Sequence, residues 1–249
     1  MRLLSWNIHK GIGGRDRRYS LARIMDCIES QNPDLFALQE VDRHVGRSRH
    51  DDQPRLLARH LGFQSAYQSV VSVGRGGYGN LILSRWDVGS RHRVSLRLGG
   101  RKPRGAQLLV VETPEGPLHL VNTHLGLTEH ERQWQASRLV SHALFTAAEH
   151  LPTLLVGDFN DWRNTLSTAV LSAAGFVQVT TPSSLFRSFP AWLAVGSLDK
   201  AFVRGSLEIH EARILRTRIT RDASDHLPLL VDFHIRPSNR AGRFSSPSR

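Results

Sequence analysis

Cysteine is almost absent from this chain: its 249 residues include a single one, Cys27. One cysteine excludes an internal disulfide, so the fold does not depend on an oxidising compartment. It also excludes the thiolate clusters that hold structural zinc. Cys27 lies in an amphipathic helical pattern and is most simply a packed thiol. We therefore expect a fold that is stable under reducing conditions, and a cytoplasmic location.

Long apolar runs are absent as well. The longest have the length of a strand, as at residues 153–156, whereas a span across a bilayer needs roughly 18 to 20 apolar residues. The opening residues, Met1 to Asn7, lack the apolar core and the small-residue cleavage site of a secretory signal. No transmembrane segment is therefore predicted, and we expect a soluble protein.

Acidic residues are too few to balance the basic ones. Lys and Arg total 33 against 22 Asp and Glu, which gives a net charge of +11. Such an excess favours polyanionic partners such as nucleic acid or acidic lipid. Part of it lies in residues 236–249, which are rich in Arg, Ser and Pro and are expected to be a disordered basic tail. The sequence does not indicate an oligomeric state.

Short apolar runs alternate with helical patterns along the rest of the chain. The predicted strands are residues 3–6, 35–38, 81–83, 108–111, 118–121, 154–156 and 229–233. Helices are predicted over 21–28, from a capping box at Thr128 and Glu131 through Ala147, and over 166–174. Because no repeat or linker precedes the tail, residues 1–235 are expected to form one α/β domain.

Polar residues follow most of these apolar runs. Those at run ends are Asn7, Glu40, His124 and Asp158, with Asn160 two residues further on. The order reverses near the end of the chain, where Asp225 and His226 precede the last run. An antiparallel strand would bring that pair to the same edge, so we predict that all these side chains converge there. Any one of them alone would more simply be a solvated or turn-capping residue.

The residue types at these positions suit a hard metal ion. Carboxylate and amide oxygens bind Mg²⁺ or Mn²⁺, and Mg²⁺ typically takes one or two carboxylates while keeping waters and a substrate phosphate. Glu40 is the first choice of ligand. A nearby carboxylate or imidazole would orient and deprotonate the attacking water. The pattern therefore predicts metal-dependent hydrolysis of a phosphate ester.

Six short segments carry a resemblance to a known family. They are Ser5-Trp6-Asn7, Leu38-Gln39-Glu40-Val41, Asn122-Thr123-His124-Leu125, Gly157-Asp158-Phe159-Asn160, Leu198-Asp199 and Ser224-Asp225-His226-Leu227-Pro228. In this order, the set closely resembles the endonuclease/exonuclease/phosphatase family, which includes deoxyribonuclease I, abasic-site endonucleases, neutral sphingomyelinases and inositol polyphosphate phosphatases. The chain is most similar to uncharacterised bacterial members. The resemblance implies an α/β (α+β) four-layer sandwich, in which two packed mixed β-sheets are flanked by helices.

The resemblance also implies the metal ligands. Glu40 is similar to the principal metal ligand of the family, with Asn7 beside it. Asp225 resembles a further carboxylate of the metal site. The implied cofactor is Mg²⁺ or Mn²⁺.

The remaining motif residues resemble the family's catalytic groups. Asp158 looks like the residue that activates or positions the water, and Asn160 like the one that orients water and phosphate. His226 resembles the histidine that contacts the scissile phosphate, with Asp199 as its carboxylate partner. His124 matches a position that stabilises the phosphate or assists the leaving group. Which residue acts as the base stays open.

Several residues near these motifs are candidates for substrate contacts. Arg163 and Arg187 could clamp a phosphate, because a guanidinium suits bidentate contacts with anions, and Asn80 could line the pocket. Lys200 departs from the aromatic residue or Arg that many relatives carry after the aspartate, which puts substrate contacts in doubt.

His9 and Lys10 are more simply solvated loop residues. Aromatic residues that could stack a base are more simply core residues; they are Trp162, Phe189 and Trp192.

The substrate is left open by these motifs. The basic charge favours nucleic acid, because contacts with its backbone are electrostatic. A phospholipid or another small-molecule phosphodiester or phosphomonoester is the alternative, although no exposed apolar segment for a bilayer stands out. A non-catalytic module that binds nucleic acid or phosphoinositide is less favoured, since all eight candidate positions hold chemically competent residues.

Overall fold

Two six-stranded β-sheets form the centre of the computed structural model, which describes residues 1–236. The first sheet holds, in spatial order, β11 (Leu207–Ile214), β12 (Leu229–Ile235), β1 (Arg2–Asn7), β2 (Leu35–Arg43), β4 (Gly76–Ser84) and β3 (Gln64–Val73). The second holds β5 (Val88–Ser95), β6 (Gly105–Thr113), β7 (Gly116–His124), β8 (Thr153–Asp158), β10 (Asp199–Arg204) and β9 (Val177–Gln178). Every predicted strand lies within one of these elements.

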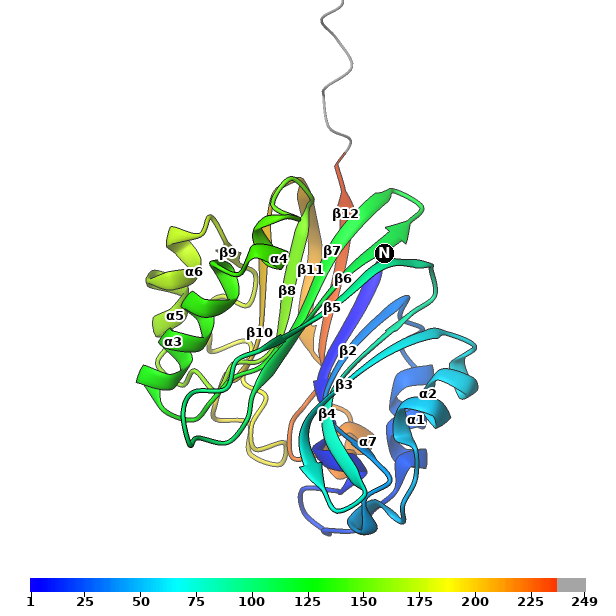
Figure 1. Cartoon of the computed structure of the whole chain (residues 1–249). Helices are drawn as coiled ribbons and strands as arrows, with labels where there is room; N and C mark the ends of the chain where they lie inside the picture. Colours follow the sequence, from blue (N-terminus) through cyan, green and yellow to red (C-terminus); the bar gives the residue numbers. More distant parts are fainter. Residues whose placement is uncertain (237–249) are drawn as a thin grey trace, which may run out of the picture.

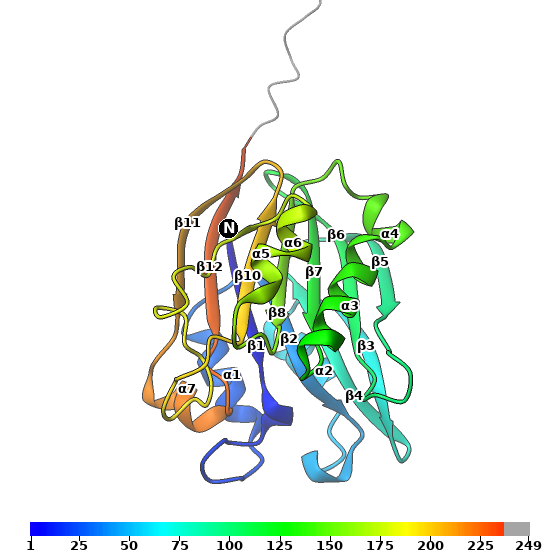
Figure 2. The ribbon, with the colours of Figure 1, turned by 90° about the vertical axis from the view of Figure 1, so that its left-hand side faces the viewer.

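Helices cover the outer faces of both sheets (Figure 1). The first sheet is covered by α1 (Leu21–Glu29), α2 (Gln53–Leu61) and α7 (Arg218–Ala223). The second is covered by α3 (Glu129–Val140), α4 (Ala143–Thr146), α5 (Thr165–Thr168) and α6 (Val170–Ala173), which lie across it in Figure 2. Short 3-10 helices, η1 (His9–Gly11) and η2 (Gly46–Ser48), follow β1 and β2. The predicted four-layer sandwich is confirmed.

The central strands read as continuous apolar runs because both of their faces are covered. Along β1 and β2, Leu3 and Leu35 face the space between the sheets. Their neighbours Leu4 and Phe36 face the helices, as expected for a side-chain period of two. The same alternation gives the sandwich three apolar layers.

Two predicted helices are shorter than expected. The helix that begins after Thr128 ends at Val140, because His142 has an extended backbone (φ −71°, ψ 135°) and caps α4 through Nδ1, which accepts the Leu144 N–H. The helix predicted over 166–174 is divided into α5 and α6 at Ala169, whose backbone is not helical (φ −118°, ψ −99°). The predicted cap itself is confirmed, since Thr128 Oγ1 accepts the Glu131 N–H at 3.3 Å.

The predicted basic tail, residues 236–249, lies outside the described residues except for Arg236, which pairs with Glu208 at 2.9 Å. The domain boundary at residue 235 therefore stays a prediction. Within residues 1–236, no helix is both long enough and apolar enough to cross a membrane.

Buried amide side chains connect the two sheets near the ends of β2 and β7. Asn122 Nδ2 donates to the Leu38 carbonyl at 3.0 Å and to the Leu81 carbonyl at 3.2 Å, while its Oδ1 accepts from Gln39 Nε2 at 2.8 Å. Asn80 Nδ2 donates in the opposite direction, to the Gly105 carbonyl at 2.9 Å. These bonds hold β2 and β4 against β6 and β7 at the edge where Glu40 and His124 lie.

We predict that Asn122→Leu lowers the free energy of unfolding by about 2–4 kcal/mol, because it removes the buried donor to two carbonyls and one buried acceptor of Gln39 Nε2. Denaturant unfolding at neutral pH measures this loss. The matched control is Ser84→Ala: the buried Ser84 hydroxyl bonds to the backbone of Trp86, two residues away, and its removal should cost about 1 kcal/mol or less. Equal losses in the two variants would contradict a special role for the contact between the sheets.

Candidate active site

The predicted polar residues do converge at one edge of the sandwich, and they come from both sheets. In the second sheet, His124 lies beside Asp158, and Asp158 lies beside Asp199, at the neighbouring ends of β7, β8 and β10. In the first sheet, β12 runs antiparallel to β1, so the residues that precede β12 lie beside the end of β1. Trp6 Nε1 secures this junction by donating to the His226 carbonyl at 2.8 Å.

A pocket of about 280 Å³ opens at this edge. Its lining residues are Asn7, Glu40, Lys102, Arg104, His124, Leu127, Asp158, Asn160, Trp162, Phe189, Leu198, Asp225 and His226. Asp199 lies behind His226 and is completely buried. All eight motif residues are therefore in the pocket wall or directly behind it.

Asp158 is the most connected side chain of the pocket. Its Oδ2 accepts from Asn7 Nδ2 at 3.0 Å and lies 3.4 Å from His124 Nε2 and 3.7 Å from His226 Nε2. Its Oδ1 accepts the Asn160 N–H at 3.0 Å. Burial raises the pKa of the Asp158 carboxyl, although His226 opposes this shift. The result is a carboxylate with increased proton affinity, as a general base requires.

His226 and Asp199 form a buried pair. His226 Nδ1 lies 2.8 Å from Asp199 Oδ2, which also accepts from Ser188 Oγ at 2.5 Å. Burial alone would lower the pKa of His226, but the Asp199 and Asp158 carboxylates outweigh burial and raise it. The imidazole therefore stays positively charged at neutral pH and presents Nε2 to the pocket.

His124 has the opposite electrostatic environment. Burial and the neighbouring Arg104 cation lower its pKa well below the ordinary value, although Glu40 opposes them. Its Nδ1 is 4.0 Å from Glu40 Oε1. The pocket thus contains one charged and one neutral imidazole on either side of Asp158.

Glu40 reaches the pocket because β2 is irregular at this residue. The register with β4 shifts between Leu38 and Val41, and Glu40 has a left-handed backbone with φ +55°. Such a conformation is costly for a residue with a side chain and is often found at functional sites.

The Glu40 carboxylate contacts the Lys10 ammonium. Although burial raises the pKa of Glu40, Lys10 and His124 outweigh it and keep the pKa well below its ordinary value.

The sequence reasoning missed three residues of this site. Arg104 and Lys102 line the pocket, and Ser188 supports Asp199 from behind. Arg104 immediately precedes β6, whose first residue, Gly105, pairs with His124 in antiparallel register. The argument that places Asp225 and His226 at the site edge therefore applies equally to Arg104.

Some predicted residues do not line the pocket. Asn80 lies in a small adjoining cavity, where its amide is engaged with the Gly105 carbonyl. Arg163 and Arg187 are exposed and do not reach the pocket wall. Lys200 is fully buried and donates to Asn164 Oδ1 at 2.8 Å, away from the pocket.

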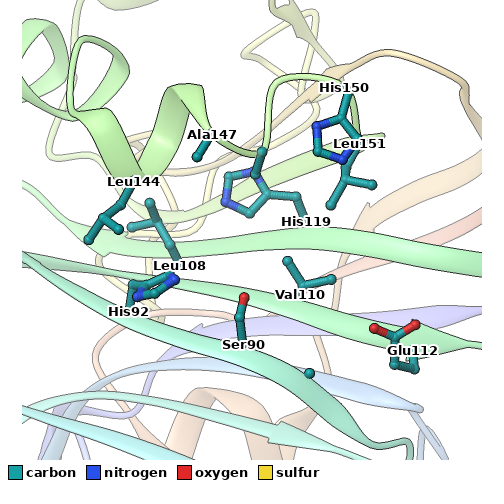
Figure 3. A pocket seen from close by; sticks show the side chains of 12 residues that line it. Ser90, His92, Leu108, Val110, Glu112, His119, Leu144, Ala147, His150 and Leu151 are labelled. Atoms are coloured by element: carbon teal, nitrogen blue, oxygen red, sulfur yellow. The ribbon is translucent and has the colours of Figure 1, made fainter.

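A separate cavity of about 330 Å³ lies beside α4, on the outer face of the second sheet (Figure 3). His92, His119 and His150 line it together with aliphatic side chains such as Leu108. Burial lowers the pKa of His119 to about 4, and its ring packs edge-on against Phe145 at 5.4 Å. His119 is therefore a neutral packing residue, and the cavity shares no residue with the pocket at the sheet edge.

The profile of the endonuclease/exonuclease/phosphatase family matches residues 4–226, which include all eight motif residues. The chain belongs to this family. YbhP, an uncharacterized protein of Escherichia coli (strain K12), is 28% identical over 245 residues, which cover 94% of this chain and 96% of YbhP.

Solved structures of the endonuclease/exonuclease/phosphatase family share the fold of this chain. A member from Beutenbergia cavernae superposes with a TM-score of 0.80 at 20% identity, covering 94% of this chain and 71% of that one. A mannosyl-6-phosphatase of Bacteroides thetaiotaomicron superposes with a TM-score of 0.70 at 20% identity, covering 94% of this chain and 99% of that one.

Enzymes of this family generally depend on a divalent metal ion. Within residues 1–236, no group of three or more His, Cys, Asp or Glu side chains is arranged as a metal site. The oxygen donors nevertheless suit an ion that needs few protein ligands: Glu40 faces the pocket, and Asp225 Oδ1 is buried with no hydrogen-bond partner in the described part of the chain. The Lys10 ammonium is the cation that neutralises Glu40 in this arrangement.

We predict that Asp199→Asn lowers kcat by about 10²-fold or more while changing KM little, because the amide no longer stabilises a charged His226. Steady-state kinetics on a chromogenic phosphodiester measure both constants, and circular dichroism checks the fold. Asp161→Asn is the control, since Asp161 is equally buried but bonds to the start of α5. A normal kcat with a raised KM would make Asp199 a binding residue instead.

Proposed function

We propose that this protein is a divalent-metal-dependent hydrolase that cleaves a phosphate ester by means of an activated water. The observation that carries the proposal is the environment of Asp158, which lies between His124, the charged His226 and Asn7 in one pocket with Glu40. A base, a cationic donor and a metal-type carboxylate are the groups that phosphate ester hydrolysis needs. Their completeness argues against a module that binds without catalysis.

Asp158 is the proposed base. Its carboxylate combines a raised pKa with a place in the pocket wall, so it can take a proton from a water that attacks the phosphorus. Asn160 Nδ2 donates to the Leu125 carbonyl at 3.0 Å, which leaves the amide oxygen to orient that water. The backbone of Asn160 is left-handed, with φ +51°, and its N–H donates to Asp158 Oδ1 at 3.0 Å.

His226 is proposed to stabilise the charge that develops on the phosphate. The Nε2–H of its imidazolium faces the pocket, while Asp199 holds Nδ1 on the other side of the ring. The neutral His124, on the opposite side of Asp158, would contact the phosphate or the leaving group. These roles need a charged His226 and a neutral His124, and the surroundings of each ring favour that protonation state.

Glu40 and Asn7, with Asp225 nearby, would hold the metal ion, for which Mg²⁺ or Mn²⁺ is proposed. When bound, such an ion polarises the phosphate oxygens and neutralises developing charge. Lys10 must release Glu40 for this to happen, and its freed ammonium is then available to the phosphate.

The buried Arg104 is proposed to bind the substrate phosphate. Its side chain is 6% exposed, and its Nε has no hydrogen-bond partner among residues 1–236. An unsatisfied buried guanidinium is unfavourable unless an anion pairs with it, and the pocket is open to one. A bound phosphate supplies the missing acceptors.

The charge of the chain bears on which class of phosphate ester is cleaved. The net charge of +11 supports nucleic acid, the substrate favoured by the sequence, or another polyanion. A phospholipid is the alternative. We also propose a cytoplasmic location and a catalytic domain that ends near residue 235.

Removal of divalent metal is expected to abolish hydrolysis of a chromogenic phosphodiester, and Mg²⁺ or Mn²⁺ to restore it. Glu40→Gln should raise the apparent metal dissociation constant by about tenfold or more, because the variant keeps the shape of the ligand but loses its charge. Isothermal titration of the apoprotein measures this constant without relying on turnover. Glu112→Gln, on the exposed side of β6, is the control. Full activity in excess chelator would refute metal dependence.

Arg104→Met should lower kcat/KM by about 10- to 100-fold, the worth of a charge-assisted pair with a phosphate. Arg101→Met lies in the same connecting segment, is exposed and does not line the pocket, so it should stay close to wild type. Inorganic phosphate should protect wild type from thermal unfolding more than it protects the Arg104 variant. Equal protection of the two would exclude Arg104 as a phosphate ligand.

A further inference from the structure

Large apolar side chains are exposed around the mouth of the pocket. They are Leu127 at 71%, Trp162 at 56%, Trp192 at 51%, Leu193 at 65% and Val195 at 51% exposure, and we call these five residues the apolar rim. The sequence suggested that no exposed apolar segment stands out and that both tryptophans are core residues. Both expectations are wrong: Trp162, in the segment after β8, and Trp192, in the turn before β10, are each more than half exposed.

The apolar rim has a defined conformation. Phe189 and Gly196 form a β-bridge that closes the turn 190–195, and the Leu193 N–H donates to the Pro190 carbonyl at 2.9 Å. The Ala191 N–H donates to the Asp225 carbonyl at 2.7 Å and so fastens the turn to the site. Figures 1 and 2 both show this segment (yellow) at the end of the sandwich next to α7 (orange).

The apolar rim is continuous with the catalytic groups. The Trp162 ring packs edge-on against Phe189 at 6.0 Å, and Phe189 lies 4.8 Å from the His226 ring. Leu127 and Trp162 also line the pocket. A surface that covers the rim therefore lies directly beside the position of the scissile phosphate.

Cationic side chains flank the apolar rim. Arg163 follows Trp162 directly and Arg187 precedes the turn, and both are exposed. Arg216 is exposed as well, and its Nη2 donates to the carbonyls of Leu185 at 3.0 Å and Arg187 at 3.2 Å. Exposed apolar groups with arginines around them match a surface that is apolar inside and anionic outside.

We propose that the apolar rim docks the pocket onto an anionic phospholipid surface, so that the phosphate ester cleaved is that of a lipid headgroup. The proposal rests on the phosphoesterase function proposed above. Tryptophans suit the level of the headgroups, and leucine and valine suit the acyl boundary below it. Single-stranded nucleic acid is the poorer match, because base stacking needs aromatic rings and three of the five rim side chains are aliphatic.

The test compares two double variants of the full chain. Leu193→Ser with Val195→Ser removes apolar surface from the rim without touching a residue that lines the pocket. Leu56→Ser with Val177→Ser removes the same residue types from exposed positions on α2 and β9. Co-sedimentation with vesicles of phosphatidylcholine and phosphatidylglycerol should fall about tenfold for the rim variant and stay unchanged for the control.

Three further measurements separate the possible outcomes. Hydrolysis of a small soluble chromogenic phosphodiester should be equal in wild type and both variants, whereas release of the headgroup from vesicle phosphatidylglycerol should fall only in the rim variant. Vesicle binding that does not change in the rim variant would overturn the proposal. The proposal would also be overturned if the rim variant lost binding to a single-stranded oligonucleotide but kept binding to vesicles, because the rim would then be a base-stacking surface. Failure of wild type to cleave the soluble diester refutes the proposed function, while sedimentation still tests docking.

Discussion

The hydrogen bonds of Asn122 hold together the part of the structure on which the site depends. One side chain on β7 bonds to Leu38 and Gln39 of β2 and to Leu81 of β4, all at full burial. These hydrogen bonds between the buried faces of the two sheets are directional, whereas the aliphatic contacts around them are not. They set how far β2 can slide over β7, and so they set the distance between Glu40 and His124. A catalytic edge made from two sheets needs such a constraint.

Burial lowers the pKa of both pocket histidines, and the neighbouring charges decide which one keeps its proton. His226 faces two carboxylates and keeps its proton, whereas His124 faces Arg104 and loses it. Asp158 sits between them with increased proton affinity. The site therefore holds a proton acceptor and a cationic donor within 3.7 Å of one another at neutral pH. This charge separation supports the proposed hydrolysis of a phosphate ester.

Several features escaped sequence reasoning for identifiable physical reasons. The helix α2 has a start signal in Asp52, whose side chain accepts the Arg55 N–H, and a stop signal in Gly62, with φ +68°. Only nine helical residues lie between the two, which is too short a stretch for a clear apolar pattern. The strands β3, β5 and β11 alternate between buried and exposed residues or lie at sheet edges, and such strands lack continuous apolar runs. Trp192 lies in a turn that is fastened by the bond of the Ala191 N–H to Asp225, whereas Trp162 lies in the segment after β8 and packs against Phe189; both placements depend on contacts that are distant in sequence.

The sequence by itself determined the strands of the sandwich and the identity of its eight motif residues, because a buried strand is a local apolar run and a ligand-type residue at its end is visible in the same few letters. Only the tertiary structure decided which residues share the pocket. Arg104 and Lys102 enter through antiparallel pairing of β6 with β7, and Glu40 turns inward through a bulge against β4. These contacts join segments far apart in the chain, and no local pattern encodes which partner each segment finds.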